Sequence, residues 1–187
     1  FSKVSNNKYF VELGFDFNEC NSLNLIRNGW NGILIDANED KCLMMENCLK
    51  FFYPKNNVKV LNSKVNKDNI NEIIFSNIMQ KRIDFLSIDI DGNDYWVLEK
   101  LPNEFSKIIV AEYNSCFGDK LMVSVPNIRG FQRKKYHYSH LCFGTSIKAL
   151  TDLLSKKGYI FLGTNLLRTN AFFILKKFKD KINFNYI

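Results

Sequence analysis

Acidic and amide side chains follow short apolar runs at three places in this sequence. The run within Asp84–Asp94 delivers the carboxylates of Asp89 and Asp91, a glycine, an amide and a third carboxylate to one spot. Two similar runs upstream carry Glu12 near the end of the first and Asp36 at the end of the second. Buried strands that end this way are typical of the carboxyl edge of a parallel sheet, where open α/β folds bind ligands. The pattern therefore predicts a pocket for a ligand with positive charge and hydroxyl groups.

The turn after the first run argues against a dinucleotide. A dinucleotide site needs Gly-x-Gly-x-x-Gly, because backbone amides must approach a pyrophosphate at the start of a helix. Here only Gly14 is present, and Asp16 and Glu19 occupy the other two glycine positions. Two carboxylates would repel a pyrophosphate, and no Walker pattern occurs in the chain.

S-adenosylmethionine has the opposite requirements, since it carries a sulfonium and an ammonium and lacks phosphate. Acidic residues at the first turn suit its cationic methionine half. Asp36 can accept both ribose hydroxyls, as acids do at this position in other nucleoside-binding sheets. The alternative for Glu12 and Asp36 is that they are solvated acids at strand ends, but three acidic strand ends in register favour the cofactor.

Strands and helices alternate along most of the chain, which predicts a mostly parallel sheet with helices on both faces. The expected strands are 9–13, 32–36, 58–63, 83–88, 108–113, 159–163 and 171–176. The expected helices are 20–28, 39–52, 67–78, 95–101 and 146–157. We expect the last two strands to pair as an antiparallel hairpin at the sheet edge. Residues 115–144 have no sustained period, and an irregular stretch of this length predicts a lid or an acceptor-binding loop.

Size and composition predict one domain over residues 1–187. No run approaches the roughly 20 apolar residues of a membrane helix, so we expect no membrane span. No leader-like segment precedes the first strand, so we expect a cytoplasmic protein. The five cysteines are irregularly spaced and without a Cys-x-x-Cys pair, which favours buried, reduced thiols.

The formal charge of +7 has two explanations. Either the composition is biased towards lysine, or the protein meets an anionic partner such as phosphate or nucleic acid. The spread of the charge favours compositional bias, with exceptions in one loop and at the tail. The exceptions are Arg129, Arg133, Lys134 and Lys135, and then Lys176, Lys177, Lys179 and Lys181.

Several segments together resemble FkbM-type methyltransferases, within the class I S-adenosylmethionine-dependent fold. The resemblance covers nearly the whole chain in order and is most specific at Trp30–Asp36 and Ser87–Trp96. The other matching segments are 10–14, 21–25, 84–86, 110–114, 138–139, 144–147, 157–159 and 170–173. It implies a Rossmann-like sheet of seven strands with an antiparallel last strand, and methyl transfer, usually to oxygen.

The resemblance also implies residue roles. Glu12 and Gly14 would border the methionine half, and Asp36 the ribose. Asn62 and Ser63 would lie near adenine, Asp89 and Asp91 would face the reacting centre, and Ala37 is expected to bind cofactor too. One departure is Phe17, where many members have a second glycine. Its side chain would either narrow the cofactor slot or turn into the core.

A hydroxyl acceptor must lose its proton, which needs a general base or a metal ion. Asp89, Asp91, Glu112 and His140 are the candidate catalytic residues, with His140 and His137 in the expected lid. An all-oxygen set would suit Mg²⁺ or Ca²⁺, with Asp89, Asp91 and Asn114 as candidate ligands. The alternative for Asn93 or Asp94 is to cap the following helix.

The lid interleaves aromatic and basic residues, which could stack on a sugar or base and hold a phosphate, or pack on the sheet. We therefore predict an S-adenosylmethionine-dependent methyltransferase that acts on oxygen of a saccharide or another small hydroxylated acceptor. The alternatives are an inactive binding or scaffold module with the same fold, for which Phe17 is the best argument, and an RNA-modifying enzyme. The oligomeric state stays open.

Overall fold

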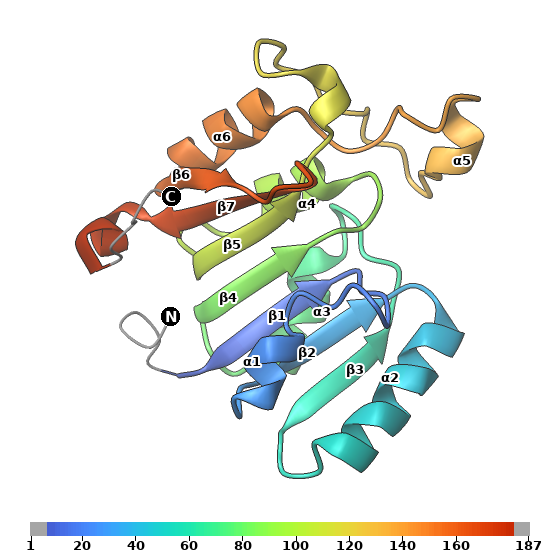
Figure 1. Cartoon of the computed structure of the whole chain (residues 1–187), viewed down its shortest axis with the longest axis vertical. Coiled ribbons are helices and arrows are strands. Elements are labelled where there is room, and N and C mark those ends of the chain that lie inside the picture. The colour runs from blue at the N-terminus through green and yellow to red at the C-terminus, as the bar shows by residue number, and fades with distance from the viewer. Residues whose placement is uncertain (1–6, 182–187) are drawn as a thin grey trace.

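The computed structural model describes residues 7–181, and its centre is one seven-stranded sheet (Figure 1). The strands are β1 Tyr9–Leu13, β2 Asn31–Asp36, β3 Val58–Asn62, β4 Ile83–Ile88, β5 Ser106–Glu112, β6 Tyr159–Thr164 and β7 Asn170–Leu175. Their order across the sheet is β3-β2-β1-β4-β5-β7-β6. β1 to β5 are mutually parallel, and β7 runs antiparallel to both β5 and β6. The predicted fold class, including the antiparallel last strand, is therefore confirmed.

Helices cover both faces of this sheet. They are α1 Leu23–Arg27, α2 Glu39–Phe52, α3 Ile70–Asn77, α4 Asp94–Lys100, α5 Arg133–Tyr136 and α6 Ile147–Lys156, with short 3-10 turns η1 Ser115–Phe117 and η2 Lys176–Lys181. Successive strand residues point to opposite faces, so Phe10 packs with α1 and α2 while Val11 packs with α3, α4 and α6. Because both faces are covered, the central strand β4 is buried at all six positions, and four of its residues are apolar.

Local sequence signals explain where the longer helices begin. The side chain of Asn38 accepts a hydrogen bond from the Lys41 amide at the start of α2 (3.0 Å), and Ser146 does the same for Ala149 in α6 (3.2 Å). Both helices bury one apolar stripe, which in α6 contains Leu150 and Leu154.

Residues 115–144 form the lid, and it lies at the side of the sheet to which the arrowheads of β4 and β5 point (Figure 1). Backbone hydrogen bonds close its base, from Val125 N to Gly144 O (3.0 Å) and from Ser146 N to Val123 O (2.9 Å). Two side chains near the start of α4 hold its middle: Trp96 Nε1 donates to Val125 O (2.8 Å), and Asn93 Nδ2 donates to Ile128 O (3.0 Å). These hydrogen bonds fix the lid to the sheet edge.

Some sequence predictions need correction. α1 and α3 are shorter than expected, and the lid contains α5 and η1, which no periodicity indicated. The expectation of buried thiols holds for Cys42 alone, because Cys116 is exposed and Cys20, Cys48 and Cys142 are half-buried; all five are free. Within residues 7–181, no helix is long and apolar enough to span a membrane.

Candidate functional site

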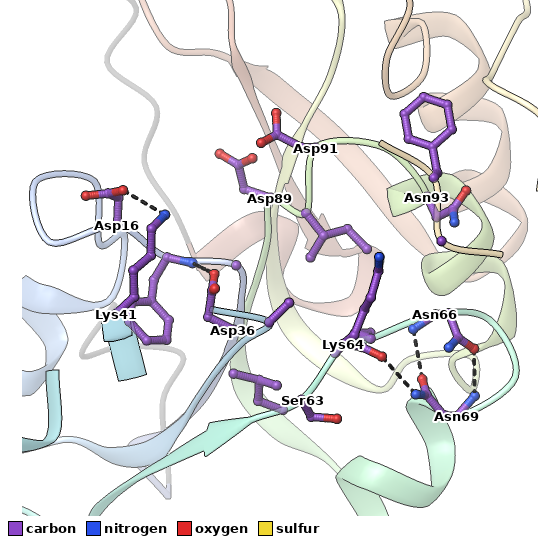
Figure 2. Close-up of a pocket in the computed structure, with 18 of the residues that line it drawn as sticks. Asp16, Asp36, Lys41, Ser63, Lys64, Asn66, Asn69, Asp89, Asp91 and Asn93 are labelled. Atoms are coloured by element: carbon purple, nitrogen blue, oxygen red, sulfur yellow. Dashed lines mark hydrogen bonds and ion pairs between the residues drawn. The ribbon is translucent and has the colours of Figure 1, made fainter. Parts of the chain in front are cut away.

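A cleft of about 670 Å³ lies over the carboxyl ends of the parallel strands (Figure 2). Its walls come from the turns after β1, β2, β3 and β4 and from lid residues 129–131. Its charged lining residues are five carboxylates, Asp16, Glu19, Asp36, Asp89 and Asp91, and three bases, Lys41, Lys64 and Arg129. The cleft therefore suits a ligand that is cationic at one end.

Gly14 forms the floor of the cleft because no larger residue fits there. Its φ is +75°, and its amide donates to Ile35 O (2.8 Å). A β-carbon at this position would lie 1.6 Å from the backbone oxygen of Asp89, and Asp89 N in turn donates to Leu13 O (2.8 Å). The turns after β1 and β4 are thus in direct backbone contact, and a glycine is required at position 14.

Glu12 lies beneath the first turn and is not part of the cleft lining. It is completely buried, and its carboxylate accepts hydrogen bonds from the amides of Asn21 and Ser22, both at 2.8 Å. Burial is the main cause that raises the pKa of Glu12. These contacts make Glu12 a support for the loop between β1 and α1, and its predicted contact with the methionine half stays a prediction.

Asp36 faces the cleft from the end of β2 (Figure 2). Its carboxylate accepts from the amides of Asn38 (2.7 Å) and Phe15 (3.3 Å), so backbone bonds fix its orientation. Ala37 and Ser63 also line the cleft. Asn62 is not among the lining residues, since its Nδ2 donates to Asp36 O (3.3 Å).

The structure contradicts both positions expected for Phe17. The side chain is 51% exposed, so it has not turned into the core, and it does not line the cleft. The neighbouring Phe15 is buried and lines the cleft in its place.

Asp89 and Glu112 form a pair of carboxyl groups at the ends of β4 and β5. Glu112 is 9% exposed, and its Oε2 has no hydrogen-bond partner among residues 7–181. Burial, with Asp94 and Asp89 nearby, raises the pKa of Glu112 to about 10. Burial, with Asp94 and Asp91 nearby, raises the pKa of Asp89 to about 7. Near neutral pH Glu112 is therefore protonated, whereas Asp89 titrates in that range.

The turn after β4 departs from the expected capping arrangement. Asn93 occupies the N-cap position of α4, but its side chain makes no cap hydrogen bond and instead holds the lid. Asp94 folds back and accepts from the amides of Ile90 (2.9 Å) and Gly92 (3.0 Å). A β-carbon on Gly92 would lie 2.3 Å from the Phe131 ring, so the lid packs directly on this turn.

Asp91 and His140 meet at a second cavity, of about 460 Å³, beside the first. The Asp91 carboxylate is 71% exposed and pairs with Arg133 (3.2 Å). The His140 carbonyl accepts from Arg133 Nε (2.7 Å). His140 therefore lies near Asp91 but borders only the second cavity, while Asp89 borders only the first.

The three candidate metal ligands do not form a cation site. Asn114 is buried, with its amide nitrogen donating to Leu141 O (2.6 Å) and Phe143 O (3.0 Å) and its oxygen accepting from Cys116 N (3.0 Å). Over the described residues, 7–181, no group of three or more His, Cys, Asp or Glu side chains could hold a metal ion. Asn114 instead positions the lid.

Sequence reasoning missed one wall of the cleft. Lys64, Asn66 and Asn69 approach from the loop between β3 and α3, and Lys41 approaches from α2, where it pairs with Asp16 (2.7 Å) (Figure 2). The run of polar residues directly after β3 was the available signal. Lid residues 129–131 complete the lining, although the sequence did not connect them with the cofactor side.

Solved structures with a similar architecture include a methyltransferase and a domain that binds S-adenosylhomocysteine. The N-terminal domain of EvdMO1, solved with S-adenosylhomocysteine (SAH), aligns at a TM-score of 0.54 and 13% identity over 92% of this chain and 75% of that one. An O-methyltransferase from Bacillus cereus in complex with SAH aligns at a TM-score of 0.54 and 15% identity, over 90% of this chain and 74% of that one. Monomeric WbdD aligns at a TM-score of 0.53 and 12% identity over 89% of this chain. The alignment covers only 36% of the WbdD chain. The chain has the Rossmann-like methyltransferase fold.

No protein-family model matches the sequence, and no curated protein does. Membership of the FkbM family therefore stays a prediction, resting on the sequence motifs alone.

Proposed function

We propose that this chain is an S-adenosylmethionine-dependent methyltransferase that methylates an oxygen of a small hydroxylated acceptor, such as a saccharide. The observation that carries the proposal is the cleft itself. Its floor is the backbone at Gly14, its rim bears Asp36, Asp89 and Asp91, and its first turn lacks the glycines of a phosphate cradle. A cationic adenosyl compound without phosphate satisfies all three features.

The donor would lie along the turns after β1, β2 and β3. Asp36 would accept the ribose hydroxyls, with its carboxylate already oriented by the amides of Asn38 and Phe15. Gly14 and Ser63 both line the cleft, and there Gly14 would border the methionine half and Ser63 the adenine. When bound, S-adenosylmethionine supplies a methyl group on a sulfonium whose leaving group is a neutral thioether.

Asp89 is the group best suited to take the acceptor's proton. Its pKa of about 7 lets it be ionised, and still basic, near neutral pH. The acceptor oxygen would form its bond to the methyl carbon as the carbon–sulfur bond breaks, and the proton of the hydroxyl would pass to Asp89. Glu112, protonated, would orient the Asp89 carboxylate by donating a hydrogen bond to it. Holding the acceptor oxygen in line with the methyl carbon and the sulfur accounts for much of the catalysis of such a displacement.

The structural neighbours support the donor and the acceptor class. Two of them hold SAH, and one of these is named an O-methyltransferase. The EvdMO1 domain has also been crystallised in the presence of SAH and D-fucose, which supports a sugar-like acceptor. FkbM membership, a cytoplasmic location and a single domain over residues 1–187 belong to the same proposal.

Calorimetric titration with SAH, ATP and NAD tests the proposal. We expect SAH to bind and the two phosphate-bearing ligands to bind far more weakly. Asp36→Ala should weaken SAH binding about tenfold or more, because two charge-assisted hydrogen bonds are lost. Asp40→Ala is the matched control, since Asp40 is an exposed α2 acid outside the cleft lining. Absence of SAH binding, or equal effects of the two variants, would refute the donor assignment.

The structure bears on both alternatives, the inactive scaffold and the RNA-modifying enzyme. The argument for an inactive scaffold rested on Phe17, whose side chain leaves the cleft open. The argument for RNA rested on the basic lid and tail, but Arg133 and Lys134 of the lid line one small cavity, whereas an RNA strand needs a tract of cations along successive phosphates. A small acceptor is therefore the better proposal.

A further inference from the structure

The second cavity differs in charge from the cleft beside it. Its lining is Asp91, Phe131, Gln132, Arg133, Lys134 and His140. The one carboxylate, Asp91, is already paired with Arg133, which leaves Lys134 and the His140 ring without an acidic counterpart in this lining. The acidic cleft and this basic cavity thus stand side by side, with Asp91 and Phe131 common to both.

Arg133 is held in place before any ligand binds. Its Nε donates to His140 O (2.7 Å), one terminal nitrogen contacts Asp91 (3.2 Å), and its plane lies 3.6 Å from the centre of the Phe143 ring. A guanidinium fixed on three sides loses little side-chain freedom when an anion arrives. It also keeps the segment that carries Lys134 beside Asp91.

The second cavity lies next to the proposed reacting centre at Asp89, because the two cavities share lining residues. Asp91 borders both spaces and is two residues from Asp89 in the turn after β4. An acceptor whose hydroxyl points at Asp89 would therefore extend past Asp91 into the second cavity. The volume of about 460 Å³ is within the range of roughly 300 to 1,000 Å³ that small-molecule sites occupy.

We propose that the second cavity is the acceptor subsite and that the acceptor is an anionic hydroxylated compound, whose phosphate or carboxylate binds Lys134 and Arg133. The inference rests on the proposed function and names the substrate class for it. A small molecule is favoured over RNA because these cations line one cavity, whereas an RNA strand needs a tract of cations along successive phosphates.

Titrations of the SAH-saturated protein with D-glucose 6-phosphate, D-glucuronate and D-glucose test this inference. At least one anionic sugar should bind about tenfold or more tightly than D-glucose, and the tighter of the two identifies the anion as phosphate or carboxylate. If neither anionic sugar binds better than D-glucose, the inference is wrong. Because SAH binding is measured first, its loss would refute the proposed function, whereas intact SAH binding with no anion preference refutes the subsite alone.

A pair of neighbouring lysines provides the control. Lys134→Ala should reduce binding of the preferred anionic sugar about tenfold, while Lys135→Ala should leave it unchanged, since Lys135 is exposed and outside the lining. Both variants should keep the circular dichroism spectrum of the parent. Equal effects of the two substitutions would contradict the subsite, as would Lys134-dependent binding of a short oligouridylate with no binding of either anionic sugar.

Discussion

The donor end and the acceptor end of the site are built in different ways. At the donor end, Gly14 directly follows β1 and Asp36 is the last residue of β2, and hydrogen bonds with backbone groups fix both. At the acceptor end, the lid is irregular and is held by side chains such as Trp96 and Asn114 that bond to its carbonyls. The sheet therefore sets the positions of the proposed donor-binding residues. The positions of the lid residues depend on a few side-chain contacts, which can vary without changing the fold.

The largest effect is expected from Gly14→Ala. The new β-carbon would collide with the Asp89 carbonyl at 1.6 Å, so the two turns must separate, and the free energy of unfolding should fall by more than about 3 kcal/mol. Urea denaturation measures this loss. Gly29→Ala is the matched control, because Gly29 has the same φ of +75° but no atom within 4 Å of its added β-carbon. Gly29→Ala should lower the free energy of unfolding by about 1 kcal/mol. Similar losses for both variants would show that the destabilisation comes from backbone strain and not from the contact between the two turns.

Asp89→Asn separates chemistry from donor binding. The variant keeps the size of the side chain but removes the base, so methyl transfer should fall at least about a hundredfold while SAH affinity stays nearly unchanged. In the parent protein the rate should rise with pH through about 7, the pKa of Asp89, and this rise should be absent from the variant's residual rate. A variant that transfers methyl groups at the parent rate would exclude Asp89 as the base.

The same variant should alter the pH dependence of stability. The pKa of Asp89 is raised from 3.8 to about 7 in the folded chain, so the folded state binds more protons than the unfolded state between these values. Asp89 therefore lowers stability progressively as pH rises through that window. Thermal melts should show Asp89→Asn more stable than the parent at pH 8, with the difference shrinking towards pH 4. A difference between variant and parent that stays constant from pH 4 to pH 8 would contradict the raised pKa of Asp89.

The smallest effect is expected from Trp96→Phe, which removes the hydrogen bond to Val125 O and keeps an aromatic ring. The loss should be about 1 kcal/mol and should appear as faster amide exchange of lid residues 123–131. Exchange in β1 and β4 should not change, because the donor end does not depend on this bond. Equal acceleration in the lid and in the strands would contradict the division between the two ends.

The sequence predicted the fold because the strands are short apolar runs between clear helix signals. The bounds of β1, β4 and α2 agree with the prediction to the residue. It indicated where the lid lies in the chain but not its path, which is set by contacts between residues far apart, such as Asn93 with Ile128 and Trp96 with Val125.

The site was predictable in part for the same reason. The structure brings Gly14, Asp36, Ala37, Ser63 and Asp89 to one cleft because each lies at the end of a parallel strand or directly after it. The Glu12 side chain points away from the cleft and bonds the loop after β1, and the Asn114 side chain bonds the lid. Neither orientation can be read from the neighbouring residues in the sequence. The pairing of Asp89 with Glu112 likewise needs the register of β4 beside β5.

A crystal structure of the chain with SAH bound would show whether the cleft is the donor site. We expect the ribose hydroxyls on the Asp36 carboxylate, the methionine half beside Gly14 and the sulfur near Asp89. Electron density for SAH at any other place, or a cleft that stays empty at saturating ligand, would contradict it.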